Sequence, residues 1–286
     1  MIIDKKAIKQ IFPELTPPDF NCINIGLISH DYMKSILTFI ESENFINNLV
    51  LNKNIKAVLC TEKIAAKLPI KYAKIVCDDP KYYFFTLYNI LKKKAYKKSK
   101  NIIENSADIH SSANISSHNV IIGKNVIIGE NVTIKSDVEI GDNCIISSGS
   151  VIGQEGFEFK RTTKGIIYVF HDKKTKLLKN VYIGANSIID RGIYRDTILG
   201  NNCKIDSNCH IAHASVLEDN VLVASRSTIC GNVNVQNGAW VGPGSIISNN
   251  ITIGTNVRIG IGSNVIKNIP ANTTVLGNPS RAIKSD

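Results

Sequence analysis

The stretch LGNNCKIDSNCHIAHASVLEDNVLV, residues 199–223, places an aliphatic residue at every sixth position and a small or β-branched residue four positions after each. This period continues without a break from Leu199 to Val265, and an earlier run keeps it from Ile122 to Ile152. A period of six matches neither the 3.6-residue repeat of a helix nor the alternation of an ordinary strand. It predicts a parallel β-helix, in which short strands turn corners and successive coils bury one continuous apolar column.

One long segment interrupts the coils. It reads QEGFEFKRTTKGIIYVFHDKKTKLLKN, residues 154–180, and VYIGANSII then resumes the pattern. A long loop expelled from a regular solenoid is more often functional than not. We therefore expect this insertion to cover a site.

Residues 1–100 have a different pattern, and we expect a small α/β domain there. Short apolar strands are indicated at 57–60 and 74–77, and a helix by KYYFFTLYNILKKK, residues 81–94. The run KKKAYKKSK, residues 92–100, carries six lysines in nine residues and is expected to be a solvated linker. The predicted parts are thus the α/β domain at 1–100, the β-helix at 101–270 and a tail at 271–286.

Composition excludes several classes of protein. The 286 residues are 43% apolar and 20% charged, as in globular proteins. Because no run of about 18 apolar residues and no long apolar N-terminal core occurs, we expect neither a membrane span nor a signal peptide, and a cytoplasmic location. Seven cysteines without a CxxC pair indicate reduced thiols. The net charge of +10 suits nucleic acid, a membrane surface, or the phosphates of nucleotides and coenzyme A.

A zinc site is a first interpretation of Cys203, Cys209, His210 and His213. In a six-residue period, however, each repeat turns onto the next face of the coil, so the two thiols point inward at different corners. Both cysteines occupy the phase of the small core residues, which a buried thiol fills well. The spacing therefore argues against a metal.

His213 has a different phase, because it lies two residues past the inward position of Ile211. One coil of about eighteen residues earlier falls near Arg195 and Asp196, in the segment DRGIYRDT, which breaks the six-residue count. We expect this segment to bulge outward beside His213. An imidazole next to a carboxylate can act as a general base with an orienting partner. On spacing alone, His213 can equally be a surface histidine in a turn.

The order of these features resembles the UDP-3-O-acylglucosamine N-acyltransferases of lipid A synthesis over nearly the whole chain. The matching stretches are LTFIESENF, KAVLCTEKIAAKLP, VIGQEGFEF, IGANSIIDRG and the run from DTILGN to KIDSNCHIAH. IDRG and IAH are the specific motifs, whereas hexapeptides alone indicate only a superfamily that includes other nucleotide-sugar N-acyltransferases. The resemblance implies a homotrimer of left-handed β-helices with active sites between subunits, and a first domain that binds the nucleotide.

The resemblance also implies roles for residues of the coils. His213, the histidine of IAH, would take the proton from the sugar amine as that amine attacks a thioester, and Asp196 becomes a candidate orienting carboxylate. His210 stands where the family usually has glutamine, so we expect it to line the substrate pocket. Asn250 stands where the lipid A enzymes carry a second histidine, and we assign it to substrate binding.

In the first domain, Phe39 and Phe45 match aromatic positions that the family associates with the nucleotide base. Ser42 replaces the asparagine expected between them, which leaves the nucleotide open between UDP and dTDP.

The tail PANTTVLGNPSRAIKSD, residues 270–286, stands where the lipid A enzymes continue into helices associated with acyl carrier protein. It resembles the tail of small sugar acetyltransferases, whose GNP-x-R segment lies near coenzyme A. Phosphate contacts are therefore expected from Lys267, Asn278, Arg281 and Lys284, with ordinary exposed charges of the tail as the alternative.

The sequence thus predicts an N-acyltransferase that transfers an acyl group, in the first place acetyl from acetyl-CoA, to the amine of a UDP- or dTDP-linked amino sugar for surface polysaccharide. The alternative is the lipid A reaction itself, with a 3-hydroxyacyl group on acyl carrier protein, which the matching first domain favours. A non-catalytic scaffold that binds nucleotide sugar, and nucleic-acid binding through the lysines, are the other hypotheses. The break between IDRG and IAH favours an enzyme, because a scaffold has no reason to break its repeat beside a histidine.

Overall fold

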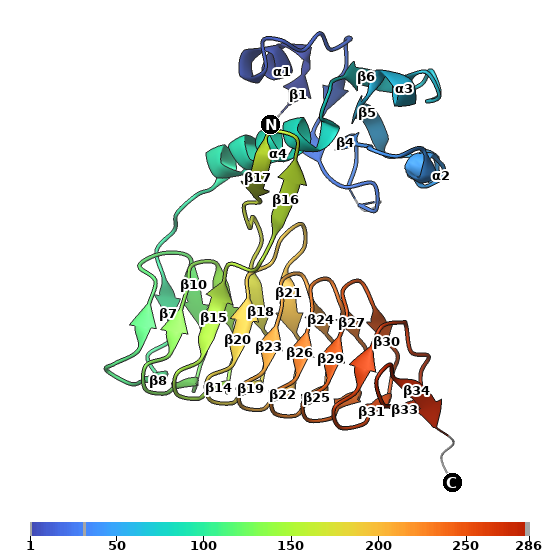
Figure 1. The fold of residues 1–286 in the computed structure, drawn as a ribbon. Helices are drawn as coiled ribbons and strands as arrows, with labels where there is room; N and C mark the ends of the chain where they lie inside the picture. The colour runs from blue at the N-terminus through green and yellow to red at the C-terminus, as the bar shows by residue number, and fades with distance from the viewer. Residues whose placement is uncertain (1, 31–32, 284–286) are drawn as a thin grey trace. The chain divides into compact units, whose positions relative to one another are not determined.

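The computed structural model describes residues 2–30 and 33–283. The chain forms two compact units, one of Met1–Tyr96 with Glu158–Phe170 and one of Lys97–Phe157 with His171–Asp286. Figure 1 shows the second unit as a stack of coils built from short strands. Among residues 2–30 and 33–283, no helix is both long enough and apolar enough to span a bilayer.

Three sheets form the faces of the β-helix in the second unit. The first contains β7 (Ile102–Ile103), β10 (Val120–Ile122), β13 (Val138–Ile140), β18 (Thr175–Leu177), β21 (Thr197–Leu199), β24 (Val216–Leu217), β27 (Asn234–Val235) and β30 (Thr252–Ile253). The second contains β8 (Asp108–Ile109), β11 (Ile127–Ile128), β14 (Ile145–Ile146), β19 (Tyr182–Ile183), β22 (Lys204–Ile205), β25 (Leu222–Val223), β28 (Trp240–Val241), β31 (Arg258–Ile259), β33 (Thr274–Leu276) and the antiparallel β34 (Arg281–Ile283). The third contains β9 (Asn114–Ile115), β12 (Thr133–Ile134), β15 (Val151–Gln154), β20 (Ile188–Asp190), β23 (His210–Ile211), β26 (Thr228–Ile229), β29 (Ile246–Ile247) and β32 (Asn264–Val265).

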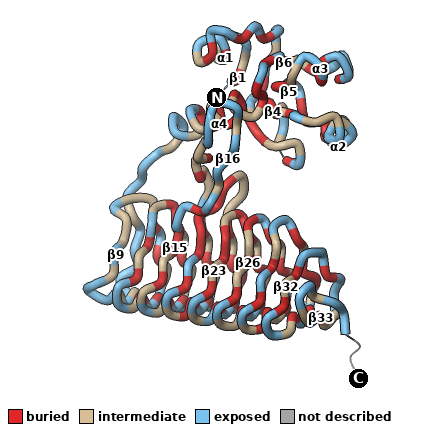
Figure 2. Tube along the Cα trace, viewed as in Figure 1, coloured by how far each residue is buried: buried red, intermediate tan, exposed pale blue. Residues whose placement is uncertain are grey.

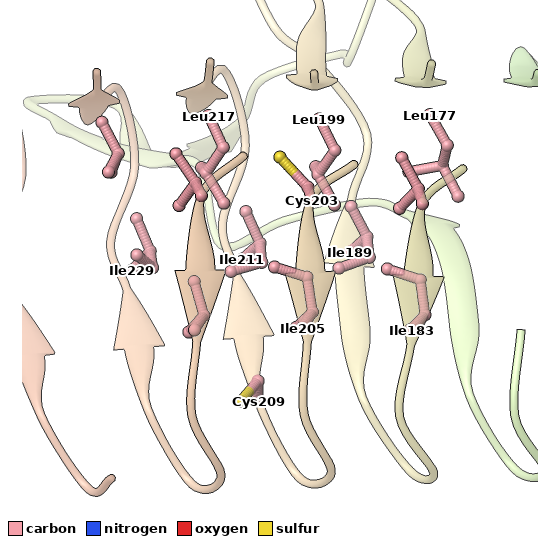
Figure 3. Packing of buried hydrophobic residues seen from close by; sticks show 14 of the residues in the cluster. Leu177, Ile183, Ile189, Leu199, Cys203, Ile205, Cys209, Ile211, Leu217 and Ile229 are labelled. Atoms are coloured by element: carbon pink, nitrogen blue, oxygen red, sulfur yellow. The ribbon is translucent and has the colours of Figure 1, made fainter. Parts of the chain in front are cut away.

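The strand register explains the six-residue period. Ile205 pairs with Val223, and Val223 pairs with Val241, so side chains of one phase stack above each other in successive coils. Figure 2 shows buried residues recurring along the coils, and Figure 3 shows aliphatic side chains of this kind, among them Ile205, in the interior. Removing this apolar surface from water is the main favourable term for such a solenoid.

Cys203 and Cys209 lie in this interior at different positions, as their phase predicts (Figure 3). Burial raises the pKa of the Cys203 thiol to about 11. The thiol of Cys203 donates to the carbonyl of Glu218 at 3.1 Å. Both cysteines are therefore packing residues of the core.

The corners between strands account for the asparagines of the repeat. Asn202 and Asn220 both have a φ of +60°, in the left-handed region that asparagine tolerates better than most residues. The side-chain amide of Asn202 donates to the side-chain oxygen of Asn220 at 3.2 Å, one coil further on. Corner asparagines thus connect successive coils as well as turning the chain.

The first unit contains a parallel sheet in the order β3 (Asn24–Ile25), β4 (Ile36–Phe39), β5 (Ile55–Cys60) and β6 (Ala73–Val76). An antiparallel pair, β1 (Ile3–Asp4) and β2 (Asn21–Cys22), precedes it. The helices are α1 (Lys5–Ile11), the 3-10 turn η1 (Glu43–Phe45), α2 (Ile46–Leu51), α3 (Glu62–Ala65) and α4 (Pro80–Ala95). β5, β6 and α4 overlap the strands and the helix that the sequence predicts, and an α/β domain is confirmed.

The insertion predicted as a loop contains a β-hairpin of β16 (Phe159–Thr162) and β17 (Gly165–Tyr168). The hairpin belongs to the first unit and packs on α4. The side-chain amide of Asn89 donates to the carbonyl of Tyr168 at 2.7 Å, and its oxygen accepts the N–H of Phe170 at 2.8 Å. One helix residue therefore secures the second arm of the hairpin.

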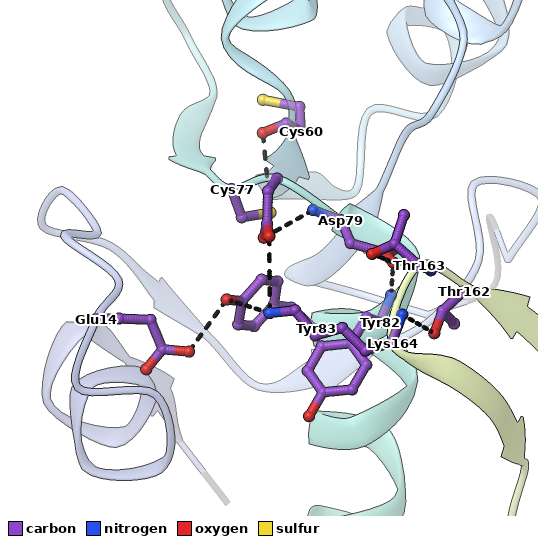
Figure 4. A network of polar contacts seen from close by, with 10 residues as sticks. Glu14, Cys60, Cys77, Asp79, Tyr82, Tyr83, Thr162, Thr163 and Lys164 are labelled. Atoms are coloured by element: carbon purple, nitrogen blue, oxygen red, sulfur yellow. Dashed lines mark hydrogen bonds and ion pairs between the residues drawn. The ribbon is translucent and has the colours of Figure 1, made fainter.

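Asp79 secures the turn of the hairpin (Figure 4). Its Oδ1 caps α4 by accepting the N–H of Tyr82 at 2.9 Å, and its Oδ2 accepts both the N–H and the hydroxyl of Thr163 at 2.6 Å. Burial by itself raises the pKa of this carboxyl, but these hydrogen bonds outweigh burial and hold the pKa of Asp79 below its ordinary value. Next to it, the ammonium of Lys164 donates to the Tyr83 hydroxyl at 3.0 Å.

Candidate active site

The segment after β20 enlarges one coil of the β-helix. Ile188 of β20 pairs with His210 of β23, whereas Lys204 pairs with Leu222, so this coil is four residues longer than its neighbour. Gly192 lies in the resulting bulge, where a Cβ atom would approach the carbonyl oxygen of Arg195 to 2.5 Å. The glycine of the IDRG motif is thus required by close backbone packing.

Arg191 fastens this bulge to the coil before it. Its guanidinium forms an ion pair with Asp137 at 2.7 Å, and its Nε donates to the carbonyl of Lys173 at 2.9 Å. The side chains of both partners in the ion pair are at most 10% exposed. A buried and hydrogen-bonded pair of this kind holds the backbone of residues 190–195 in one arrangement.

Asp190 ends β20 and lies beside the first residue of β23. Its carboxylate is almost fully buried, and its Oδ2 lies 3.0 Å from Nε2 of His210. This hydrogen bond raises the pKa of His210, against the opposing effect of burial. The pair therefore favours a protonated imidazole on an otherwise half-exposed side chain.

His171, which no sequence motif singles out, lies against His213. The His171 side chain is fully buried, and its Nε2 accepts the N–H of Gly156 at 3.1 Å. The centroids of the two imidazole rings are 5.9 Å apart, with an interplanar angle of 83°. Burial, followed by the proximity of His213, lowers the pKa of His171. The structure thus holds one imidazole neutral next to the other.

Two glycines pack against the ring of His213. A Cβ atom on Gly156 would lie 2.9 Å from its Cδ2, and a Cβ atom on Gly231 would lie 2.6 Å from its Cε1. Gly231 is one coil beyond His213, and the N–H of Asn232 donates to the His213 carbonyl at 3.0 Å. Any side chain at either glycine would displace the imidazole.

Comparison with known proteins agrees with this architecture. The family model of the bacterial transferase hexapeptide (six repeats) matches residues 119–154 and 196–231, and the hexapeptide repeat of succinyl-transferase matches residues 179–212. The chain carries the hexapeptide repeat of bacterial transferases. The predicted left-handed parallel β-helix is thereby confirmed.

The chain is similar to several UDP-3-O-acylglucosamine N-acyltransferases. That of Rickettsia bellii is 40% identical over 93 residues, which are 32% of this chain and 27% of that protein. That of Caulobacter vibrioides is 37% identical over 92 residues, again 32% of this chain and 27% of that protein. The match thus spans about a quarter of the length of these curated relatives. The resemblance predicted from the sequence is confirmed over about a third of the chain.

A solved structure of UDP-N-acetylglucosamine acyltransferase from Campylobacter jejuni shares the fold of the hexapeptide coils. The TM-score is 0.55 at 24% identity, and the match covers 64% of this chain and 72% of that chain.

Asp196, predicted to orient His213, has other partners in the hexapeptide coils. Its Oδ1 accepts the N–H of Lys174 at 2.9 Å, and its Oδ2 lies 2.8 Å from the ammonium of Lys176. Both carboxylate oxygens are therefore engaged along β18. The predicted contact between Asp196 and His213 is therefore not seen, and the nearby carboxylate of Asp190 pairs with His210 instead.

Asn250 occupies a corner of the hexapeptide coils. Its φ is +61°, its N–H donates to the carbonyl of Gly231 at 3.1 Å, and its side-chain oxygen accepts from the Asn232 amide at 2.7 Å. These contacts are those of a corner asparagine. The geometry supports a structural role rather than the predicted role in substrate binding.

The predicted phosphate contacts lie at the C-terminal end of the β-helix, beyond β29. Lys267 follows β32, Asn278 precedes a cis peptide bond to Pro279, and Arg281 begins β34. All three side chains are exposed. Lys284 lies outside the described residues. The structure therefore does not bring these residues to the imidazole cluster.

In the first unit, the structure brings Phe39 and Phe45 together at one cavity of about 580 Å³, which Glu41 and Asn48 also line. The ring of Phe45 is half exposed at this cavity. Ser42, found where the family has asparagine, accepts the N–H of Asn44 at 3.3 Å and begins the 3-10 turn η1. The turn thus positions Phe45.

The described part of the chain, residues 2–30 and 33–283, contains no group of three or more His, Cys, Asp or Glu side chains arranged to hold a metal ion.

Proposed function

We propose that this chain is an N-acyltransferase that acylates the amine of a UDP-linked amino sugar with an acyl thioester. The observation that carries the proposal is the packing of His213 against Gly156 and Gly231, beside a second, buried imidazole. A scaffold needs no imidazole in such surroundings. The similarity of the chain to UDP-3-O-acylglucosamine N-acyltransferases supports the same reaction class.

In the proposed reaction, the nitrogen of the sugar amine attacks the thioester carbonyl and forms the C–N bond. His213 takes the proton that the amine loses. The tetrahedral intermediate then collapses, the C–S bond breaks, and the departing thiolate receives the proton from His213. The products are an amide and a thiol, and a well-placed base contributes typically 10²–10⁴-fold to such a reaction.

The oxyanion of the intermediate needs a hydrogen-bond donor, and we assign this role to the N–H of Gly231. This glycine packs directly against His213, and within residues 2–30 and 33–283 its N–H has no hydrogen-bond acceptor. A backbone donor fixed before the reaction stabilises developing charge without reorganisation.

His210 is proposed as a substrate-binding residue. Because Asp190 favours its protonated form, the half-exposed imidazolium can donate to an oxygen of the nucleotide sugar. This role is distinct from that of His213, which must be neutral to accept a proton.

The cavity between Phe39 and Phe45 is proposed to hold the nucleotide base. Aromatic side chains offer faces on which a base stacks, typically worth about 1–3 kcal/mol per base. Glu41, which also pairs with Lys81 at 2.8 Å, places a carboxylate in the lining that can accept the ring N–H of uracil or thymine.

A homotrimer is proposed as the active assembly. Outward-facing residues of the ten-stranded sheet include the exposed side chains of Ile127, Ile145 and Leu222. A row of aliphatic side chains along one face of a β-helix suits coverage by other subunits. Sedimentation velocity tests this point directly.

The donor and the acceptor can be decided together. The names of the relatives favour UDP-3-O-acylglucosamine as the acceptor. For this acceptor we propose a 3-hydroxyacyl group on acyl carrier protein as the donor, in place of acetyl-CoA. Calorimetry compares binding of 3-hydroxyacyl carrier protein and acetyl-CoA, and mass spectrometry then identifies the product with the UDP sugar. Carrier-protein binding and a long acyl product support the proposal. Exclusive use of acetyl-CoA restores the first prediction, and no transfer with either donor contradicts both.

A further inference from the structure

His171 lies at the point where the hairpin insertion returns to the β-helix, and Gly156 lies at the point where it leaves. The insertion begins after β15, and its arms form part of the first unit. The hydrogen bond from the Gly156 N–H to His171 Nε2, 3.1 Å long, joins these two points. Both residues also contact the ring of His213. The base of the insertion is thus closed next to the proposed catalytic imidazole.

We propose that His171 is a positioning residue, whose acceptor contact with Gly156 closes the base of the hairpin and whose ring holds His213 in the orientation that receives the amine proton. This inference rests on the proposed function.

The geometry assigns a tautomer to His171. A backbone N–H is always a donor, so the Nε2 atom that faces Gly156 must carry a lone pair rather than a proton. A neutral imidazole then has its proton on Nδ1. If His171 were protonated at Nε2, two N–H donors would face each other at the contact with Gly156, and the hydrogen bond between the two residues would be lost.

The surroundings of His171 oppose its protonation. The groups that act on it are His213 and Arg191, which disfavour a positive charge, and Glu155 and Asp190, which favour one. Burial is the largest effect and, together with His213, lowers its pKa. The pKa of His171 in the folded protein lies below the ordinary value of 6.5. The hydrogen bond from Gly156 to His171 is therefore present at neutral pH and is lost only as the pH falls through this lowered pKa.

The contact with His213 is directional. The rings meet edge to face at 83°, an arrangement in which the position of one ring limits rotation of the other. A base must be held within about 0.5 Å of its productive geometry for efficient proton transfer. A substitution that removes the His171 ring, or its Nε2 acceptor atom, therefore changes the orientation of the His213 ring while His213 itself stays in place.

The first test uses wild-type protein labelled with ¹⁵N at histidine. Two-bond ¹H–¹⁵N spectra reveal the protonation of each ring nitrogen, independently of any enzymatic activity. We expect an unprotonated Nε2 on His171 from pH 8 down to below 6.5. A proton on Nε2 of His171 in this range would overturn the proposal, even if the protein proves not to be an acyltransferase.

The second test compares His171→Gln, whose side-chain oxygen can accept from Gly156, with His171→Leu, which cannot accept. The exposed His110, near the start of the coils, gives the matched control His110→Leu. We expect His171→Leu to lower kcat about tenfold with KM within about twofold, and His171→Gln to recover much of that loss. We also expect the His213 ring signals to change in His171→Leu and to stay unchanged in the control.

Two outcomes of the second test would contradict the positioning role. One is a kcat for His171→Leu equal to that of the wild type. The other is an unchanged His213 spectrum in a folded His171→Leu protein. Two measurements still decide the question should His171→Leu fail to fold. One is the tautomer of His171 in the wild type. The other is the pH profile of kcat for His171→Gln, whose acid limb no longer contains the titration of His171. Absence of acyl transfer by the wild type refutes the proposed function alone.

Discussion

Replacing Gly231 by alanine places one methyl group against the ring of His213. The new Cβ would lie 2.6 Å from Cε1 and 2.8 Å from Nε2, whereas ordinary contacts begin at 3.4 Å. The ring or the backbone must therefore move by about 0.8 Å. Since a misplacement near 1 Å at a reacting group costs about 10²-fold in rate, we expect kcat to fall roughly a hundredfold. Overpacking should also lower the free energy of unfolding by about 1–3 kcal/mol.

The matched control is Gly200→Ala, at a crowded position of the same coils away from His213. A Cβ atom there would lie 2.6 Å from a carboxylate oxygen of Asp219. We expect a similar loss of stability in urea unfolding but a normal kcat. The assay follows thiol release from the acyl donor together with acylated sugar by mass spectrometry. A kcat for Gly231→Ala within threefold of the wild type, or an equal loss in both variants, would refute the reasoning.

Three further predictions concern single residues. Arg191→Leu leaves the Asp137 carboxylate buried without its ion pair, and we expect the free energy of unfolding to fall by about 3 kcal/mol in urea titrations. The contact of His210 with Asp190 raises the pKa of His210, so it stabilises the fold fully below pH 6.5. This contribution is lost as the pH rises through the raised pKa of the folded protein. The difference in unfolding free energy between wild type and His210→Gln should therefore shrink from pH 6 to pH 9. Asp79→Ala removes the acceptor of the hairpin turn, and hydrogen exchange at residues 159–168 should accelerate at neutral pH while α3 stays protected.

The β-helix could be predicted because its core is periodic in sequence. The aliphatic row through Ile205, Val223 and Val241 stacks in register, so the period in the sequence is the spacing of the coils. The hairpin of the insertion was harder to recognise because its strands pack on a helix about 80 residues earlier, through contacts such as Asn89 to Tyr168.

The choice of Asp196 as orienting residue followed from counting one regular coil back from His213. The coil in question is four residues longer, because Ile188 pairs with His210. The residue one coil before His213 is therefore close to Arg191, and the neighbouring Asp190 pairs with His210. A count of residues cannot reveal where a bulge absorbs extra chain.

His171 could not be assigned from the sequence for a different reason. It lies 42 residues before His213 within a segment that lacks the repeat, and nothing in the local sequence pairs the two. Only the return of the insertion to the coil brings the rings to 5.9 Å.

The measurement that tests the central claim most directly is acyl transfer by His213→Ala. The turnover of wild type and variant is measured with 3-hydroxyacyl carrier protein as donor and a UDP-linked amino sugar as acceptor. A thermal unfolding midpoint equal in both proteins serves as the folding control. The account predicts a loss of at least about a hundredfold in kcat with donor binding unchanged. Turnover by His213→Ala within threefold of the wild type would contradict it.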